Sequence, residues 1–110
     1  MENKFTIKVN TKKHLDPYEV IFFKSDGNYT LIHYSNRQKV DIVCKTLRLI
    51  EDKFCNLLNF IRISKSTILN TDFVVKTNKR EVILKNGETL IPSRRRARRF
   101  FNELSKHITV

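Results

Sequence analysis

The segment from Val20 to Tyr34, VIFFKSDGNYTLIHY, decides the fold class of this chain. A nearly continuous apolar run opens it and a run rich in β-branched and aromatic residues, Tyr29–Tyr34, closes it; both compositions favour strands. Between them, Ser25–Asn28 predicts a tight turn, because glycine and asparagine tolerate positive φ angles. The segment therefore predicts an antiparallel hairpin, and a third strand extends it into a meander.

Short runs of the same kind recur along the rest of the chain, so the sequence predicts a mainly β domain of about eight to ten short strands. A further strong hairpin signal is the Asn86-Gly87 pair. The expected strands are Phe5–Val9, Glu19–Lys24, Tyr29–Tyr34, Lys39–Val43, Phe60–Ile63, Thr67–Leu69, Phe73–Lys76, Glu81–Leu84 and Thr89–Ile91.

Two segments have a helical period instead. In Thr46–Phe54 the apolar residues recur three and four positions apart, which predicts a short amphipathic helix. Ser93 can cap a second helix at the C-terminal end, whose apolar stripe should pack on the sheet. This stripe consists of Ala97, Phe100, Phe101 and Leu104. The expected fold is an elongated antiparallel β-sheet sandwich with one middle helix and a C-terminal helix, forming a single domain over residues 1–110.

Positive charge is the strongest feature of the composition. The chain has 22 Lys and Arg against 11 Asp and Glu, a formal net charge of +11, and a pI of about 10.0. An excess of this size promotes association with polyanions, and such a pI is typical of nucleic-acid-binding domains. A basic surface with no such partner is the alternative at this level.

The sequence gives no support for an enzyme. Its histidines, His14, His33 and His107, are far apart and belong to no nucleophile–carboxylate pattern. Only two glycines are present, so there is no glycine-rich phosphate loop. Cys44 and Cys55 lack a metal-ligand spacing, although a disulfide between them stays open. We expect no catalytic residues, no cofactor and no metal site.

The same inspection predicts a cytoplasmic protein that does not associate with membranes. No window approaches the roughly 18 consecutive apolar residues that a membrane span needs. The first fifteen residues lack the apolar core of a secretory signal.

The segment Arg94–Arg99 contains five arginines at the start of the second helix. Cations at a helix N-terminus oppose the helix dipole, and like charges this close repel one another, so a bound polyanion would relieve the arrangement. A solvated basic helix face is the alternative. We expect Arg95 to contact a base, and Arg94, Arg96 and Arg99 to bind phosphates.

Lys65, flanked by Ser64 and Ser66, also has the chemistry for a contact to a base or a phosphate. The alternative for Lys65 is a solvated lysine that protects an edge strand from aggregation. Tyr29 is either a contact residue or a core residue, and Asn28 either a contact residue or merely a turn former. We expect Asn70 to bond nearby backbone at a turn.

Four pieces of the sequence resemble the LytTR family, the DNA-binding modules at the C-terminus of many bacterial response regulators. The resemblance covers roughly Glu19 to Leu104. Its pieces are the strand and turn Val20–Tyr29, the middle-helix residues Leu47, Ile50 and Phe54, the segment Phe60–Asn70, which resembles Phe-x-Arg-x-His-Arg/Lys-Ser-x-Ile-Val-Asn, and Leu90–Arg94 after the Asn-Gly hairpin. The chain departs from the family at Ser64, where a histidine is frequent, and in the number of its arginines.

The resemblance implies a transcriptional regulator that binds double-stranded DNA by inserting loops into two successive major grooves. The residues implied to reach DNA are Asn28, Tyr29, Ser64, Lys65, Ser66, Ser93, Arg94, Arg95, Arg96 and Arg99. Promoter direct repeats are the expected target, with either a dimer on DNA or a separate regulatory protein as a possible partner. The usual phosphoryl-acceptor domain is not in the sequence, which leaves open a stand-alone protein or a fragment. An RNA-binding or protein-interaction β domain with a basic surface is the alternative function.

Overall fold

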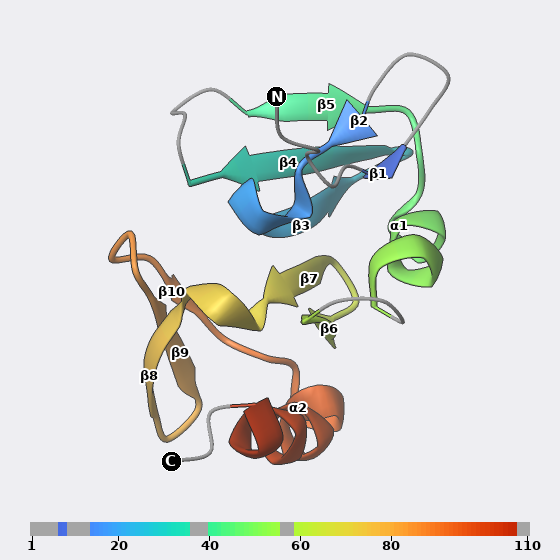
Figure 1. Cartoon of the computed structure of the whole chain (residues 1–110). Helices are drawn as coiled ribbons and strands as arrows, with labels where there is room; N and C mark the ends of the chain where they lie inside the picture. The colour runs from blue at the N-terminus through green and yellow to red at the C-terminus, as the bar shows by residue number, and fades with distance from the viewer. Residues whose placement is uncertain (1–6, 9–13, 36–39, 56–58, 108–110) are drawn as a thin grey trace.

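The structure is a computed structural model that describes residues 7–8, 14–35, 40–55 and 59–107 (Figure 1). Its strands form three antiparallel sheets, and two helices pack on them. The strands are β1 (Ile7–Lys8), β2 (His14–Leu15), β3 (Val20–Asp26), β4 (Tyr29–Tyr34), β5 (Asp41–Val43), β6 (Phe60–Ser64), β7 (Thr67–Asn70), β8 (Val74–Asn78), β9 (Glu81–Leu84) and β10 (Thr89–Leu90). The helices are α1 (Leu47–Phe54) and α2 (Arg94–His107), with 3-10 turns at Pro17–Glu19 and Thr71–Phe73.

The five-stranded sheet, in the order β5-β4-β3-β7-β6, is the centre of the fold. The predicted meander of β3, β4 and β5 is present, and the hairpin β6–β7 joins the other edge of β3. In Figure 1, α1 lies at one end of this sheet, while α2 and the small sheet β8–β10 lie below it. The mainly β fold with a middle and a C-terminal helix is thus confirmed.

Strand β3 explains why the apolar run Val20–Phe23 is continuous rather than alternating. All four side chains are buried, because hydrophobic material covers both faces of the sheet. Val20 and Phe23 belong to the cluster that includes α1, whereas Ile21 and Phe22 belong to the cluster that includes α2. A register shift between Val20 and Phe22 produces this grouping. One run of sequence therefore supplies two cores.

The helices match their predicted stripes closely. In α1, Leu47, Ile50 and Phe54 are buried, and Thr46 is the N-cap residue. In α2, Phe100 and Leu104 are buried and Phe101 packs against the same cluster. Both helices therefore bury one face and leave the other to solvent.

Several predicted strand ends are wrong by one or two residues, and local hydrogen bonds explain two of these errors. Ser25 and Asp26 belong to β3 rather than to the turn, since they pair with Thr30 and Tyr29. Phe73 ends a 3-10 turn rather than beginning a strand, because Asn70 Oδ1 accepts a bond from the Asp72 amide at 3.0 Å. Residues 5–6, 9 and 39 of the predicted strands lie outside the described residues.

Candidate nucleic-acid interface

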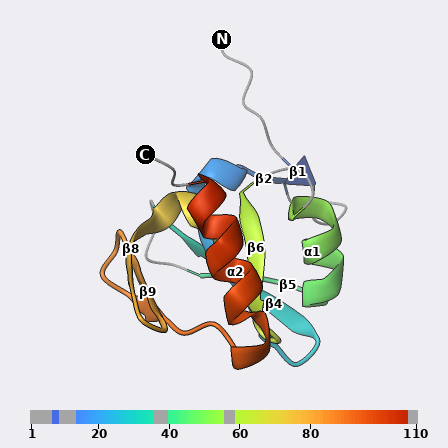
Figure 2. The ribbon, with the colours of Figure 1, turned by 90° about the horizontal axis from the view of Figure 1, so that it is seen from below.

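Three segments that are distant in the sequence meet at one edge of the molecule. They are residues 27–29 at the β3–β4 turn, residues 64–66 at the β6–β7 turn, and residues 93–96 at the start of α2. We call them together the loop edge. In Figure 2 these segments lie along the lower side of the molecule, next to one another.

Two backbone hydrogen bonds join the three segments. The Ser25 amide donates to the Ser66 carbonyl at 2.8 Å, which fixes the end of β3 to the start of β7. The Ser93 amide donates to the Ile63 carbonyl at 2.9 Å, which fixes the start of α2 to the end of β6. The relative positions of the segments are therefore set by the fold rather than by flexible connections.

The first segment is a two-residue hairpin turn. Asp26 pairs with Tyr29, and Gly27 has the positive φ angle, +64°. Asn28 does not have a positive φ, so it is not the residue that supplies the special turn conformation. Tyr29 is 49% exposed, which contradicts its alternative assignment to the core. Both side chains are accessible to a partner.

The second segment is also a tight turn, closed by the pair Ser64–Thr67. Lys65 is exposed and lies in this turn, not within a strand. The hydroxyl of Ser64 accepts a hydrogen bond from the Ser66 amide at 3.2 Å and lies 3.4 Å from the Ser66 hydroxyl. The two serines thus stabilise the turn while Lys65 extends into solvent.

The third segment begins α2. The Ser93 carbonyl accepts hydrogen bonds from the amides of Arg96 and Ala97 at 3.1 and 2.8 Å, so helical bonding begins at once. The apolar stripe of α2 turns inward, and Arg94, Arg95, Arg98 and Arg99 are exposed, while Arg96 is half-buried. The structure therefore brings all ten predicted contact residues to the loop edge or to the first two turns of α2.

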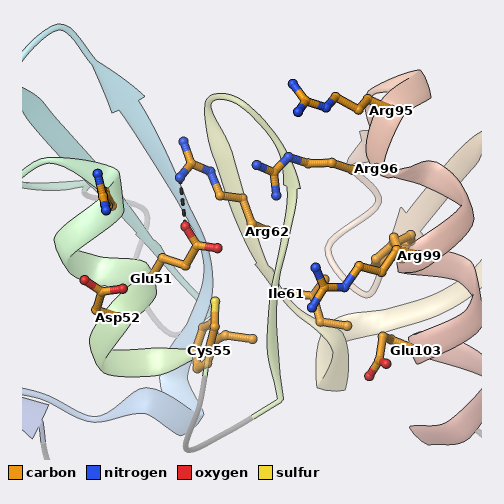
Figure 3. A pocket seen from close by; sticks show the side chains of 12 residues that line it. Glu51, Asp52, Cys55, Ile61, Arg62, Arg95, Arg96, Arg99 and Glu103 are labelled. Carbon is orange, nitrogen blue, oxygen red and sulfur yellow. Dashed lines mark hydrogen bonds and ion pairs between the residues drawn. The ribbon is translucent and has the colours of Figure 1, made fainter.

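A pocket of about 570 Å³ lies beside the loop edge, between α1, β6 and α2 (Figure 3). Its lining residues are Arg48, Glu51, Asp52, Cys55, Phe60, Ile61, Arg62, Arg95, Arg96, Arg99, Phe100 and Glu103. Arg95, Arg96 and Arg99 extend from α2 toward it, whereas Arg94 and Arg98 do not line it. The arginines of α2 are thus divided between two sides of the helix.

Arg62 and Glu51 form an ion pair in this region that sequence reasoning did not predict. The Arg62 Nη1 atom lies 2.8 Å from Glu51 Oε1. Arg62 belongs to the segment Phe60–Asn70 that carries the family resemblance. Glu51 lies eleven positions earlier, on helix α1, and no local sequence pattern connects the two residues. Asn70 was predicted to bond nearby backbone; it does so at Asp72, and its Nδ2 also donates to the Val20 carbonyl at 2.9 Å.

Two titratable groups among the described residues have clearly shifted pKa values. Burial raises the pKa of the Cys55 thiol to about 12, and Glu51 adds to the effect, so this thiol stays protonated. Burial lowers the pKa of His33, which stacks on Phe22 with ring centroids 4.2 Å apart. Cys44 and Cys55 are both free, and the described residues contain no cluster of three potential metal ligands.

A family model of the LytTr DNA-binding domain matches residues 10–105. The chain belongs to the LytTR family. This membership supports DNA binding and transcription regulation, and the family is a class of DNA-binding domains rather than of enzymes. The match begins at residue 10, nine residues before Glu19, where the resemblance seen in the sequence begins.

A solved structure has the same fold as this LytTR domain. It is described as the LytTr DNA-binding domain of a methyl-accepting/DNA response regulator from Bacillus cereus. The two chains are 18% identical and superpose with a TM-score of 0.65, over 91% of this chain and 94% of the other. No curated protein matches the sequence. None of the described helices is long and apolar enough to cross a membrane.

Proposed function

We propose that this LytTR domain is a sequence-specific transcriptional regulator that binds duplex DNA through its loop edge. The observation that carries the proposal is the pair of backbone hydrogen bonds, Ser25–Ser66 and Ser93–Ile63, which holds three contact segments side by side. Segments fixed in this way can approach one face of a double helix together. They would enter two successive major grooves.

The residues of the loop edge, together with Arg99 on the second turn of α2, divide by chemistry. Lys65 and Arg95 are long, exposed cations that can reach the acceptor atoms of guanine in the major groove. Arg94, Arg96 and Arg99, with the hydroxyls of the serines, suit phosphates. The contact set we propose is Asn28, Tyr29, Ser64, Lys65, Ser66, Ser93, Arg94, Arg95, Arg96 and Arg99.

The exposure of the aromatic residues favours duplex DNA over RNA. Sequence-specific RNA-binding sheets expose aromatic rings on which bases stack. Here Phe22, Phe23, Phe60 and Phe100 are buried, and among the described aromatic residues Tyr18 and Tyr29 are the ones with large exposed surfaces. Neither tyrosine belongs to an open aromatic face of the sheet, because Tyr18 lies in a 3-10 turn and Tyr29 begins β4.

We further propose that the chain forms one domain over residues 1–110 and acts in the cytoplasm as a regulator related to two-component systems. On promoter direct repeats, two copies would bind adjacent sites, or a separate protein would control access to one copy. The similarity in fold to the LytTr domain of a response regulator supports this type of system.

Selection from randomised duplexes, followed by footprinting, tests the proposal. We expect one preferred site, protected on one face of the DNA over two major grooves. With about 5–8 phosphates neutralised, log K should fall with log salt at a slope of about −5 to −7. A slope shallower than about −2, or equal affinity for single-stranded RNA of any sequence, would reject an extended duplex interface.

A further inference from the structure

The guanidinium group of Arg62 has all three of its nitrogens engaged. Nε donates to the Ser64 carbonyl at 3.1 Å, Nη2 donates to the Lys65 carbonyl at 2.6 Å, and Nη1 donates to Glu51 Oε1 at 2.8 Å. The Arg62 side chain is only 16% exposed. Figure 3 shows the Arg62 side chain, from β6, joined to that of Glu51, from α1, by the dashed line of the ion pair.

These hydrogen bonds, which come from within the protein, fix the turn that carries Lys65. One planar group binds two consecutive carbonyls, those of Ser64 and Lys65, and the Ser25 amide binds the next one, that of Ser66. A rigid fork of donors restricts the orientation of both peptide planes more than a single hydrogen bond would. The direction in which the Lys65 side chain leaves the turn therefore depends on Arg62.

The ion pair with Glu51 anchors the Arg62 side chain to helix α1. Glu51 lies on α1, whose buried residues Leu47, Ile50 and Phe54 attach the helix to the core. The Glu51 side chain is 32% exposed, so the pair is partly shielded from solvent. Because its charge is already paired and three of its five N–H groups donate within the protein, Arg62 is less available to a phosphate than an unpaired arginine would be.

We propose that Arg62, anchored by Glu51, is a positioning residue: it holds the Ser64–Lys65–Ser66 turn in the conformation that presents Lys65 to DNA, without touching the DNA. The inference rests on the proposed function of the loop edge and assigns a role to two residues outside the contact set. It requires that Arg62 act through Lys65.

The first test measures the turn in the absence of DNA. Arg62→Lys keeps the positive charge but replaces three donor nitrogens in one plane by a single ammonium nitrogen, which cannot reproduce the geometry of all three bonds. We expect ¹⁵N relaxation to show lower order parameters for the amides of residues 64–66 in this variant. Arg80→Lys, the same change in an exposed turn elsewhere, is the matched control and should leave those amides unchanged. An equally ordered turn in Arg62→Lys would overturn the proposal.

The second test measures DNA binding in a double-mutant cycle with Lys65→Ala. We expect Arg62→Lys to weaken binding to the selected duplex roughly tenfold, but to have little further effect once Lys65 is alanine. Additive losses would show that Arg62 does not act through Lys65. A merely stabilising role would lower the melting temperature and leave affinity unchanged well below it.

The salt dependence distinguishes positioning from direct contact. Removal of a phosphate contact reduces the salt slope by about one, as we expect for Lys65→Ala if it binds a phosphate. Arg62→Gln should leave the slope unchanged, and a reduction of about one would assign Arg62 to the DNA contacts instead. Should Arg62→Gln fold poorly, Glu51→Gln, which loosens the anchor while keeping Arg62, should lower affinity with an unchanged slope.

Failure of the proposed function would look different. If the wild-type chain bound no duplex, the loop edge would lose its assignment and Arg62 its role toward DNA. The relaxation experiment would still decide whether Arg62 orders the turn.

Discussion

Two basic hairpin turns of this domain differ in how they are held. The β6–β7 turn carries Lys65, and its three carbonyls bond to Arg62 and Ser25. The β8–β9 turn carries Lys79 and Arg80, and every residue from 75 to 80 is exposed. Lys79 there has a φ angle of +55°, which a residue with a side chain adopts at a cost.

The comparison teaches that positive charge alone does not identify a binding site. Both turns would attract a polyanion over long range, since attraction of this kind depends on charge and not on geometry. Only the β6–β7 turn has neighbours that fix its direction and place it beside other contact segments. Base recognition needs such fixed geometry, because its hydrogen bonds tolerate little displacement.

The largest expected effect is that of Arg95, the exposed arginine next to the β6–β7 turn. We expect Arg95→Ala to cost about 1–3 kcal/mol on the selected duplex and to relax preference at one base pair. Competition binding with single-base variants of the site measures both quantities. If binding to selected and random DNA weakened equally, Arg95 would be a phosphate contact only.

A smaller effect should appear when the loss of DNA affinity is compared between alanine variants of the two hairpin turns. We expect Lys65→Ala to weaken binding to the selected duplex while leaving thermal stability unchanged, because Lys65 is exposed. Arg80→Ala removes the same charge from the β8–β9 turn and should change affinity by less than about threefold. Equal losses in the two variants would mean that net charge, not position, controls binding.

The smallest effect concerns stability of the β8–β9 turn. Lys79→Gly removes the side chain from a left-handed position, and we expect stabilisation of about 0.5–1 kcal/mol. Chemical denaturation would measure it, with Lys76→Gly on the adjoining strand as a control that should destabilise. No stabilisation would show that the turn is not strained by Lys79.

The sequence predicted the elements better than their arrangement. Periodicity located both helices, because the buried stripes of Leu47, Ile50 and Phe54 and of Phe100 and Leu104 follow a 3.6-residue period. The composition of Tyr29–Tyr34 and Glu81–Leu84 located two strands to the residue. These properties are local, so they can be read from a short window.

What the sequence could not predict depends on contacts between distant residues. The insertion of β3 between β4 and β7 requires pairing across more than forty positions, which no window contains. The same is true of the Glu51–Arg62 pair and of the Asn70 bond to Val20. The ten predicted contact residues came from charge and from family resemblance, and the structure adds that nine of them lie at the loop edge, with Arg99 on the second turn of α2.

The exposed Cys44 allows a chemical reporter to be attached near the loop edge. Cys44 follows Val43, which pairs with Thr30 on β4. Cys44 therefore lies close to Tyr29, the residue before Thr30. Cys55, with a thiol pKa of about 12, reacts far more slowly with maleimides at neutral pH. A single fluorophore can therefore be attached to the natural sequence beside the β3–β4 turn, where its emission would respond to an arriving double helix.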